Sequence, residues 1–358
     1  MAHLFPDLAH VFNATVYKFF FGWLGFAVDL FFFLSGFVMY WVYVGRGTPI
    51  NWAGFYSARA ARILPLYYLT LLVFLPLTFY SMFQHGLAHV GAAYPKKLLV
   101  NFIPVSGVMD GWRATIDQPG WSISVEIFCY ILLFPLLVMA QRGLAKSMAV
   151  TFLLAVALTA IDVSFYAYPE VYVRAAWDST WLGRGLAGFA GGFLVCLLFE
   201  RAPGLRRHPF TIDAGLFACL LVFLAGRLEW IPASVTLAVF PVAVFLTAYD
   251  VGAYATLLKA RVFQWLGERS YSIYLWQFPL ITFYLFATNK VIFHAPTYTY
   301  HRGVAGWFLY AGVVLFVLLA SEASYRWFEV PARKWIKNLP SLFSARPGAA
   351  DRARRMAA

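Results

Sequence analysis

Residues 22–40 read GWLGFAVDLFFFLSGFVMY, and this stretch decides the class of fold. It contains one charged residue, Asp29, among aromatic and aliphatic side chains. A helix needs about 20 mostly apolar residues to cross the hydrocarbon core of a bilayer, and this run is long enough. The stretch therefore predicts a membrane-spanning helix rather than the core of a soluble domain.

The composition of the whole chain extends the same conclusion. Of 358 residues, 62% are hydrophobic and 20% are aromatic, while 12% are charged. Soluble domains carry about 25% charged residues, because their surfaces face water. A soluble protein of this composition would expose one large apolar patch, which soluble monomers avoid. We therefore predict an all-α, polytopic bundle of transmembrane helices.

Apolar runs divide the chain into nine predicted full spans and a partial one at the N-terminus. The partial span is expected because Met1 opens directly into apolar and aromatic residues, as if the chain began inside a first helix. The full spans are predicted at residues 22–44, 64–83, 121–140, 147–167, 181–199, 211–226, 229–249, 270–288 and 304–327. Residues 1–338 form one membrane domain in this interpretation, and residues 339–358 form a basic, disordered cytoplasmic tail.

The basic residues support this layout and give it a direction. The chain carries 28 Lys and Arg against 16 Asp and Glu, a net charge of +12. If the loop after residues 22–44 is cytoplasmic, nineteen basic residues fall on the cytoplasmic side and eight on the other, while Arg184 lies within a span. Cytoplasmic loops carry an excess of Lys and Arg, so we predict a cytoplasmic C-terminus. Because the charge follows the loops, we expect membrane lipid and no nucleic acid as a partner.

Two acidic residues inside predicted spans are candidates for function, because ionisable groups are expensive to place in lipid. Asp29, with Ser35 in the same span, either hydrogen-bonds a neighbouring helix or helps to shape a polar cavity. Glu126 belongs to WSISVEIFCYILLFPLL at 121–137, about one and a half turns into its span. A carboxylate there must be paired, hydrated or protonated. Structural pairing and acceptor binding or base chemistry both remain open for Glu126.

Two arginines lie at the predicted cytoplasmic end of the second span, in FYSARAARILPLYY at 55–68. Arg59 and Arg62 are three residues apart, so on a helix they share one face. Guanidinium groups bind phosphate oxygens in a bidentate manner, so the pair could hold a phosphate or a diphosphate. The alternative is ordinary anchoring by positive charge on the cytoplasmic side.

Polar residues recur in the last two predicted spans. In LGERSYSIYLWQFPL at 266–280, Ser270, Ser272 and Gln277 could line an aqueous cavity or belong to an interfacial aromatic belt. In ASYRWFEVPARKW at 323–335, Glu329 and Pro331 are predicted to end the last helix. A local ion pair between Glu329 and Arg333 is the simplest explanation of that carboxylate.

The histidines give one candidate for chemistry. His3 lies where the partial first helix would end, and a neutral imidazole there could act as a general base or carry an acyl group. A structural role is the alternative. His85 and His89 have a spacing that can chelate zinc, but no third ligand stands nearby, so we predict no metal site.

Five blocks, taken in order, resemble the acyltransferase-3 family of bacterial membrane O-acyltransferases. They are GFAVDLFFFLSGF at 25–37, FYSARAARILPLYY at 55–68, WSISVE at 121–126, SYSIYLWQFPL at 270–280 and FEVPARKW at 328–335. Each block is weak by itself, whereas five in order over about 22–335 are specific. The sequence departs from the family at Gln277, where a histidine is usual. It also lacks the arginine that the family carries upstream of its first-helix histidine.

The resemblance implies ten spans in the inner, cytoplasmic membrane of a bacterium. It implies a cytoplasmic acyl-CoA, often acetyl-CoA, as co-substrate and a carbohydrate or lipid-linked glycan hydroxyl as acceptor. His3 looks like the family's histidine, with His10 as the alternative, and Arg59 and Arg62 would bind the acyl-CoA. Glu126 is the second catalytic candidate.

The predicted function is the transfer of an acyl group, in most members acetyl, from acyl-CoA to a hydroxyl of a sugar, exopolysaccharide or lipid-linked glycan. The residues predicted to line the cavity that receives the sugar are Asp29, Ser35, Trp121, Ser122, Tyr274 and Gln277. A transporter or flippase for a polysaccharide precursor, whose path the same polar residues would line, is the alternative.

Overall fold

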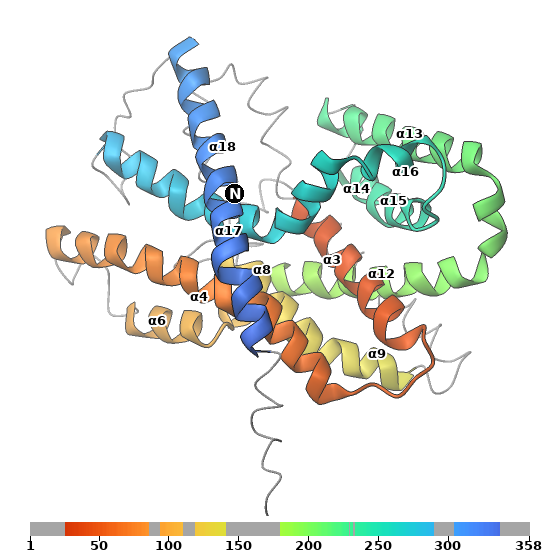
Figure 1. The fold of residues 1–358 in the computed structure, drawn as a ribbon, viewed down its shortest axis with the longest axis horizontal. Helices are drawn as coiled ribbons and strands as arrows, with labels where there is room; N and C mark the ends of the chain where they lie inside the picture. The colour runs from red at the N-terminus through yellow and green to blue at the C-terminus, as the bar shows by residue number, and fades with distance from the viewer. Residues whose placement is uncertain are drawn as a thin grey trace, which may run out of the picture.

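The computed structural model describes residues 26–85, 94–109, 119–140, 180–228, 230–231, 233–289 and 304–336. Every regular element in this part of the chain is helical, which confirms the predicted all-α class (Figure 1). The predicted span at 147–167 lies outside the described residues, and so do His3 and His10.

Long helices alternate with short helical turns along the chain. The elements are α3 (Phe26–Met39), η1 (Tyr40–Val44), α4 (Trp52–His85), α6 (Tyr94–Phe102), α7 (Ser106–Met109), α8 (Gly120–Phe128), η3 (Cys129–Leu133), α9 (Phe134–Ala140), α12 (Thr180–Arg201), η4 (Pro203–Arg207), α13 (Pro209–Arg227), α14 (Ala233–Leu237), α15 (Val239–Thr247), α16 (Ala253–Leu258), α17 (Arg261–Asn289), α18 (Val304–Ser324) and η5 (Tyr325–Glu329). The turns η1, η3 and η5 are π-helical and continue the helices that precede them, whereas η4 is a 3-10 turn.

Six of the described helices are long and apolar enough to cross a membrane. They are Ala27–Val44, Trp52–Pro76, Gly120–Ala140, Leu182–Arg201, Pro209–Gly226 and Ala311–Ile336. Each of them overlaps a predicted span, so the chain is a multi-pass membrane protein. The predicted span at 229–249 is divided between α14 and α15, which give only a shorter apolar helix at Val235–Thr247.

The predicted span at 270–288 lies inside α17, which is not one of the six. This helix has 29 residues and is therefore about 43 Å long, which is ample for a bilayer. Its serine, tyrosine and glutamine side chains lower its hydropathy below that of the other six. The full count of nine spans stays a prediction.

Two predicted helix boundaries are wrong. α4 begins at Trp52 rather than at residue 64, so Arg59 and Arg62 lie on the spanning helix itself. The last helix does not end at Glu329 and Pro331, since helical structure continues through η5 to residue 336. Proline has no N–H to donate, and the π turn directly before Pro331 already shifts the hydrogen-bond pattern there, which allows the helix to continue.

The closest approach between described helices joins α3 to α12. A Cβ atom added at Gly192 of α12 would stand 1.9 Å from the carbonyl oxygen of Phe33, and one at Gly36 of α3 would stand 1.9 Å from that of Phe189. Backbone therefore touches backbone at both ends of this contact. Small residues permit such packing between membrane helices, where the hydrophobic effect supplies little attraction.

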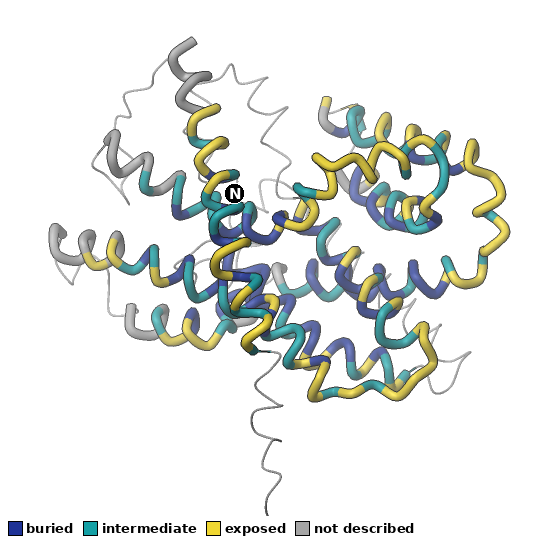
Figure 2. Tube along the Cα trace, viewed as in Figure 1, coloured by how far each residue is buried: buried dark blue, intermediate teal, exposed yellow. Residues whose placement is uncertain are grey.

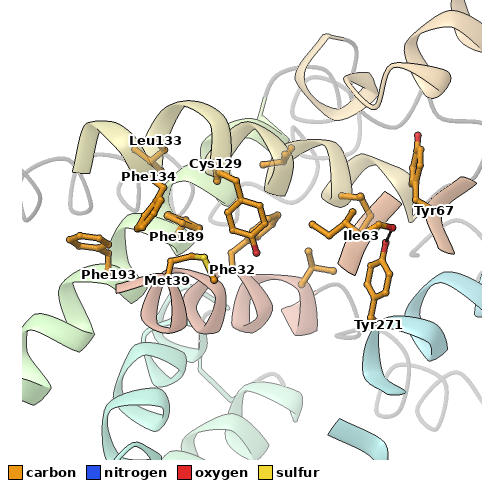
Figure 3. Packing of buried hydrophobic residues seen from close by; sticks show 14 of the residues in the cluster. Phe32, Met39, Ile63, Tyr67, Cys129, Leu133, Phe134, Phe189, Phe193 and Tyr271 are labelled. Atoms are coloured by element: carbon orange, nitrogen blue, oxygen red, sulfur yellow. Dashed lines mark hydrogen bonds between the residues drawn. The ribbon is translucent and has the colours of Figure 1, made fainter. Parts of the chain in front are cut away.

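Aromatic rings fill the space between α3, α4, η3, α9 and α12 (Figure 3). The ring of Phe55 stacks on that of Phe134 at 5.0 Å, and the ring of Tyr40 meets that of Phe193 edge to face at 4.8 Å. Figure 2 shows these buried residues where the helices cross, with exposed residues on the outer faces. The side of α18 away from the core carries exposed Leu315, Phe316 and Leu319, as expected of a helix in lipid.

The contact between α3 and α12 can be tested with a single methyl group. We expect Gly192→Ala to destabilise the protein by about 1–3 kcal/mol, because the methyl group must push α12 away from Phe33. The control is Gly183→Ala on the same helix, where an added Cβ meets nothing within 4 Å. Thermal unfolding in detergent should give a lower Tm for the first variant only. Equal Tm values would contradict this packing.

Candidate functional site

A buried carboxylate lies at the centre of the described bundle, on α8. Glu126 is 4% exposed and accepts hydrogen bonds from two hydroxyl groups, those of Tyr130 and Ser35. The Tyr130 and Ser35 oxygens also lie 2.9 Å apart, so the three side chains form a closed triangle. Ser35 belongs to α3 and Tyr130 to the π turn η3, so three helical elements meet at this carboxylate.

Arg59 of α4 lies beside this triangle without forming an ion pair to it. Its guanidinium carbon stands 5.7 Å from the ring centre of Tyr43 and 5.9 Å from that of Tyr130. Its Nη2 donates to the Tyr43 hydroxyl at 3.3 Å, while its Nε is buried and has no partner among the described residues. A buried N–H without an acceptor is costly, so this guanidinium is arranged to take a further acceptor.

Arg62 lies one turn further along α4 and is exposed. The neighbouring Ile63 carbonyl accepts a hydrogen bond from the Tyr271 hydroxyl at 2.7 Å, which ties α4 to α17 at this level (Figure 3). Arg62 is thus exposed and Arg59 half-buried, one turn apart on the same helix.

Asp29 of α3 makes a buried ion pair with Arg184 of α12. The Arg184 Nη2 lies 2.7 Å from Oδ2 and its Nε lies 3.1 Å from Oδ1, so the contact is bidentate. The two side chains are 5% and 4% exposed. The Arg184 guanidinium also lies 5.9 Å from the ring centre of Trp121. Asp29 therefore binds a neighbouring helix, the first of its two interpretations, and its role in a cavity stays a prediction.

Arg184 lies inside a predicted span, and no role was predicted for it. The sequence did indicate that Arg184 is paired, because an arginine in the middle of an apolar helix requires a partner at membrane depth. Its partner was not visible in the sequence, because the two residues are 155 positions apart.

A second small group joins α8 to α17. The hydroxyl oxygens of Ser122 and Tyr274 lie 2.8 Å apart, and they lie 3.0 and 3.3 Å from the Pro119 carbonyl oxygen, which accepts a hydrogen bond. Gln277 lies one turn beyond Tyr274 on α17, and its Nε2 is buried without a partner among the described residues. An amide in this position has a donor left for another molecule.

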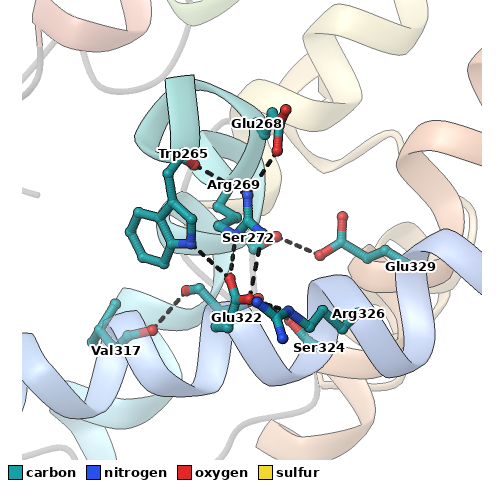
Figure 4. A network of polar contacts seen from close by, with 10 residues as sticks. Trp265, Glu268, Arg269, Ser272, Val317, Glu322, Ser324, Arg326 and Glu329 are labelled. Carbon is teal, nitrogen blue, oxygen red and sulfur yellow. Dashed lines mark hydrogen bonds and ion pairs between the residues drawn. The ribbon is translucent and has the colours of Figure 1, made fainter. Parts of the chain in front are cut away.

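The junction of α17 and α18 carries a network that the sequence did not reveal (Figure 4). Glu322 accepts hydrogen bonds from Arg269 and from the Trp265 indole, and it also pairs with Arg326. Arg269 additionally binds Glu268. This arrangement places two acidic and two basic side chains in one chain of ion pairs at the end of the helices.

The local ion pair predicted at the C-terminal end is confirmed. Arg333 Nη2 lies 2.9 Å from Glu329 Oε2, and Glu329 is also bound by the Ser272 hydroxyl of α17. Glu329 is 1% exposed. The pair thus holds η5 against α17 as well as neutralising a carboxylate.

The structure brings together some of the predicted site residues and separates others. Ser35 and Glu126 are in contact, and so are Ser122 and Tyr274, whereas Asp29 is occupied by Arg184. The catalytic roles of His3 and Glu126 stay predictions, and so does the binding of acyl-CoA by Arg59 and Arg62.

A family model for an acyltransferase domain matches residues 1–331. The chain belongs to the acyltransferase-3 family. It is therefore an acyltransferase, and its apolar helices make it a membrane-bound one. No solved structure matches the chain.

Curated relatives resemble the chain over most of its length. The chain is 27% identical to the acyltransferase MdmB of Streptomyces mycarofaciens, over 72% of this chain and 68% of that protein. It is 26% identical to the exopolysaccharide production protein ExoZ of Rhizobium meliloti, over 75% of this chain and 80% of that protein. It is also 26% identical to the O-acetyltransferase OatA of Staphylococcus aureus, over 87% of this chain, and spans 53% of that relative's length.

The buried pair of Asp29 and Arg184 can be tested by removing one charge and then both. We expect Arg184→Gln to lower the stability by about 3–5 kcal/mol, because it leaves a carboxylate uncompensated in the core. Adding Asp29→Asn should restore part of that loss. Thermal unfolding of both variants in detergent measures the effect.

The control for that pair is Lys259→Gln, which breaks an exposed ion pair with Asp250. Exposed pairs contribute about 0.2–1 kcal/mol, so this change should have little effect. If Arg184→Gln were no worse than Lys259→Gln, the pair would have no part in holding α3 to α12.

Proposed function

We propose that this membrane acyltransferase moves an acetyl group from acetyl-CoA at the cytoplasmic face to a hydroxyl of a cell-surface glycan. One observation carries the proposal: Arg59, which shares a face of α4 with Arg62, lies against the ring of Tyr130, and the Tyr130 hydroxyl donates to the buried Glu126. A candidate binding site for an anion and a buried carboxylate therefore occur together. The family supports transfer of an acyl group and gives no support to a transporter. The inner bacterial membrane and a cytoplasmic C-terminus belong to the same proposal.

On the donor side, Arg59 and Arg62 bind the diphosphate of CoA. Arg62 is exposed, while Arg59 keeps a buried Nε that has no acceptor among the described residues. A diphosphate offers adjacent oxygens at the spacing of two guanidinium groups on one helix face. The π turns η1 and η3 supply Tyr43 and Tyr130, whose rings hold Arg59 without cancelling its charge.

The reaction itself needs a base for the acceptor hydroxyl. The hydroxyl oxygen attacks the thioester carbonyl, the new C–O bond forms as the C–S bond breaks, and the hydroxyl proton passes through the base to the CoA sulfur. His3 is the base or the transient acyl carrier in this proposal. Glu126, held by Tyr130 and Ser35, accepts a hydrogen bond from the acceptor or the base.

The acceptor enters from the side of Ser122 and Tyr274. Two hydroxyls and the free Nε2 of Gln277 offer the donors and acceptors that sugar hydroxyls require. Relatives support a glycan as acceptor, since one is named as a putative peptidoglycan O-acetyltransferase, YrhL of Bacillus subtilis, and ExoZ is named for exopolysaccharide production. The chain covers half the length of YrhL.

The donor seat can be tested by ligand-induced thermal stabilisation of the purified full chain. CoA should raise the Tm of the wild type, because a ligand that binds the folded state stabilises it. We expect Arg59→Gln to weaken CoA binding by about ten- to a hundredfold, since a hydrogen bond to a charged group contributes about 1.5–3 kcal/mol. The stabilisation should then vanish at the same CoA concentration.

The matched control is Arg206→Gln, which removes one positive charge from the exposed turn η4. Arg206 has no ion-pair partner among the described residues, so its loss changes the net charge and no contact. This variant should keep the stabilisation by CoA. If CoA stabilised Arg59→Gln and Arg206→Gln to the same extent, Arg59 would not be part of a CoA-binding site.

The catalytic proposal is tested by transfer from labelled acetyl-CoA in membranes that contain the full chain. We expect His3→Ala to abolish transfer of the label to glycan while CoA still stabilises the protein, because the change removes the base and leaves the donor seat. Full transfer by His3→Ala would remove His3 from the catalytic role. Transfer by neither the wild type nor any variant would refute the proposed function.

A further inference from the structure

Two arginines in the described part of the chain share an unusual feature. The Nε atoms of Arg59 and Arg333 are both buried and have no hydrogen-bond partner there. Arg333 makes one hydrogen bond with its guanidinium group, from Nη2 to Glu329. A guanidinium carries five N–H donors, so most of those of Arg333 are not used by the described residues. A buried donor without an acceptor is rare unless a ligand supplies one.

A short series of contacts connects Arg333 to the α4 arginines. Glu329 accepts from Arg333 and from Ser272 of α17. Tyr271, which precedes Ser272, donates to the carbonyl of Ile63, the residue after Arg62. The pair of Glu329 and Arg333 therefore lies at the junction of η5 with α17, and α17 is bound to α4 at the residue after Arg62.

The other side of the last helix faces lipid. Trp327 is 80% exposed and Trp335 is 64% exposed, and exposed tryptophans are typical of the membrane interface. Glu329 and Arg333 lie on the opposite side of the helix, towards α17. The pair of Arg333 and Glu329 is thus turned away from lipid and towards α17.

We propose that Arg333 binds the 3′-phosphate of the CoA whose diphosphate is held by Arg59 and Arg62. This inference rests on the proposed function, because it requires that the chain bind CoA. CoA carries a diphosphate and, beyond the ribose, a separate 3′-phosphate. Two arginines on one face of α4 suit the adjacent phosphates, while a third on another helix suits the distant one. Glu329 and the Tyr325 ring, 5.6 Å from the Arg333 guanidinium, hold Arg333 in position.

The experiment compares CoA with 3′-dephospho-CoA, using the purified full chain in a maltoside detergent that contains no phosphate. Dissociation constants from calorimetry or thermal shift give the ratio between the two ligands. The wild type should bind CoA about ten- to a hundredfold more tightly than 3′-dephospho-CoA, as expected for a phosphate held by a guanidinium. We expect Arg333→Gln to reduce this ratio to about one, while its affinity for 3′-dephospho-CoA stays at the wild-type value.

Two matched variants make the result specific. Lys334→Gln removes the neighbouring exposed charge and should leave the ratio unchanged. Arg59→Gln should weaken the binding of CoA and of 3′-dephospho-CoA by the same factor, because both ligands carry the diphosphate. An unchanged ratio in Arg333→Gln, with Arg59→Gln still weakening both ligands, would overturn this inference alone. A wild type that binds neither ligand would instead overturn the proposed function.

Discussion

The contact between α3 and α12 is the constraint on which the rest of the described structure depends. In lipid the hydrophobic effect does not drive helices together, so packing and polar pairing must do so. Glycine at 36 and 192 lets the two backbones touch, and this proximity places Asp29 within reach of Arg184. The ion pair can form because the helices are close. Separating the helices would leave both buried charges without a partner, so the pair also opposes their separation. With α3 fixed in this way, Ser35 is delivered to the carboxylate of Glu126.

Arg184, Arg269 and Arg59 fall into two groups according to what balances their charge. Arg184 and Arg269 face carboxylates that bind them through more than one nitrogen, so their charge is largely cancelled inside the protein. Arg59 meets two aromatic rings and a hydroxyl instead. Rings and hydroxyls hold a cation in place and leave its charge available to an anion. The first group is therefore structural, and the second has the properties of a binding site.

Most of the architecture could be predicted from the sequence, because long apolar runs and the distribution of basic residues depend only on local composition. The pairing of polar residues could not. Arg184 and Glu322 were visible as charges, but their partners are 155 and 53 positions away, and no local pattern records that distance. The helix ends at Trp52 and residue 336 were missed for a different reason: charged and proline residues stop an apolar run without stopping a helix. The pair of Glu329 and Arg333 was predictable because it spans a single turn.

The π turns explain why the aromatic residues meet the arginines. A π turn inserts one extra residue into a helix, which rotates the side chains that follow and disturbs the regular hydrogen bonding, so it persists where the rotation brings a benefit. In the described chain η1 carries Tyr43, η3 carries Tyr130 and η5 carries Tyr325. Tyr43 and Tyr130 both lie against Arg59, and Tyr325 lies between Arg269 and Arg333, at 4.5 and 5.6 Å. The irregular turns thus occur where cations are held by rings at the junction of the helices, and a regular helix would direct those rings elsewhere.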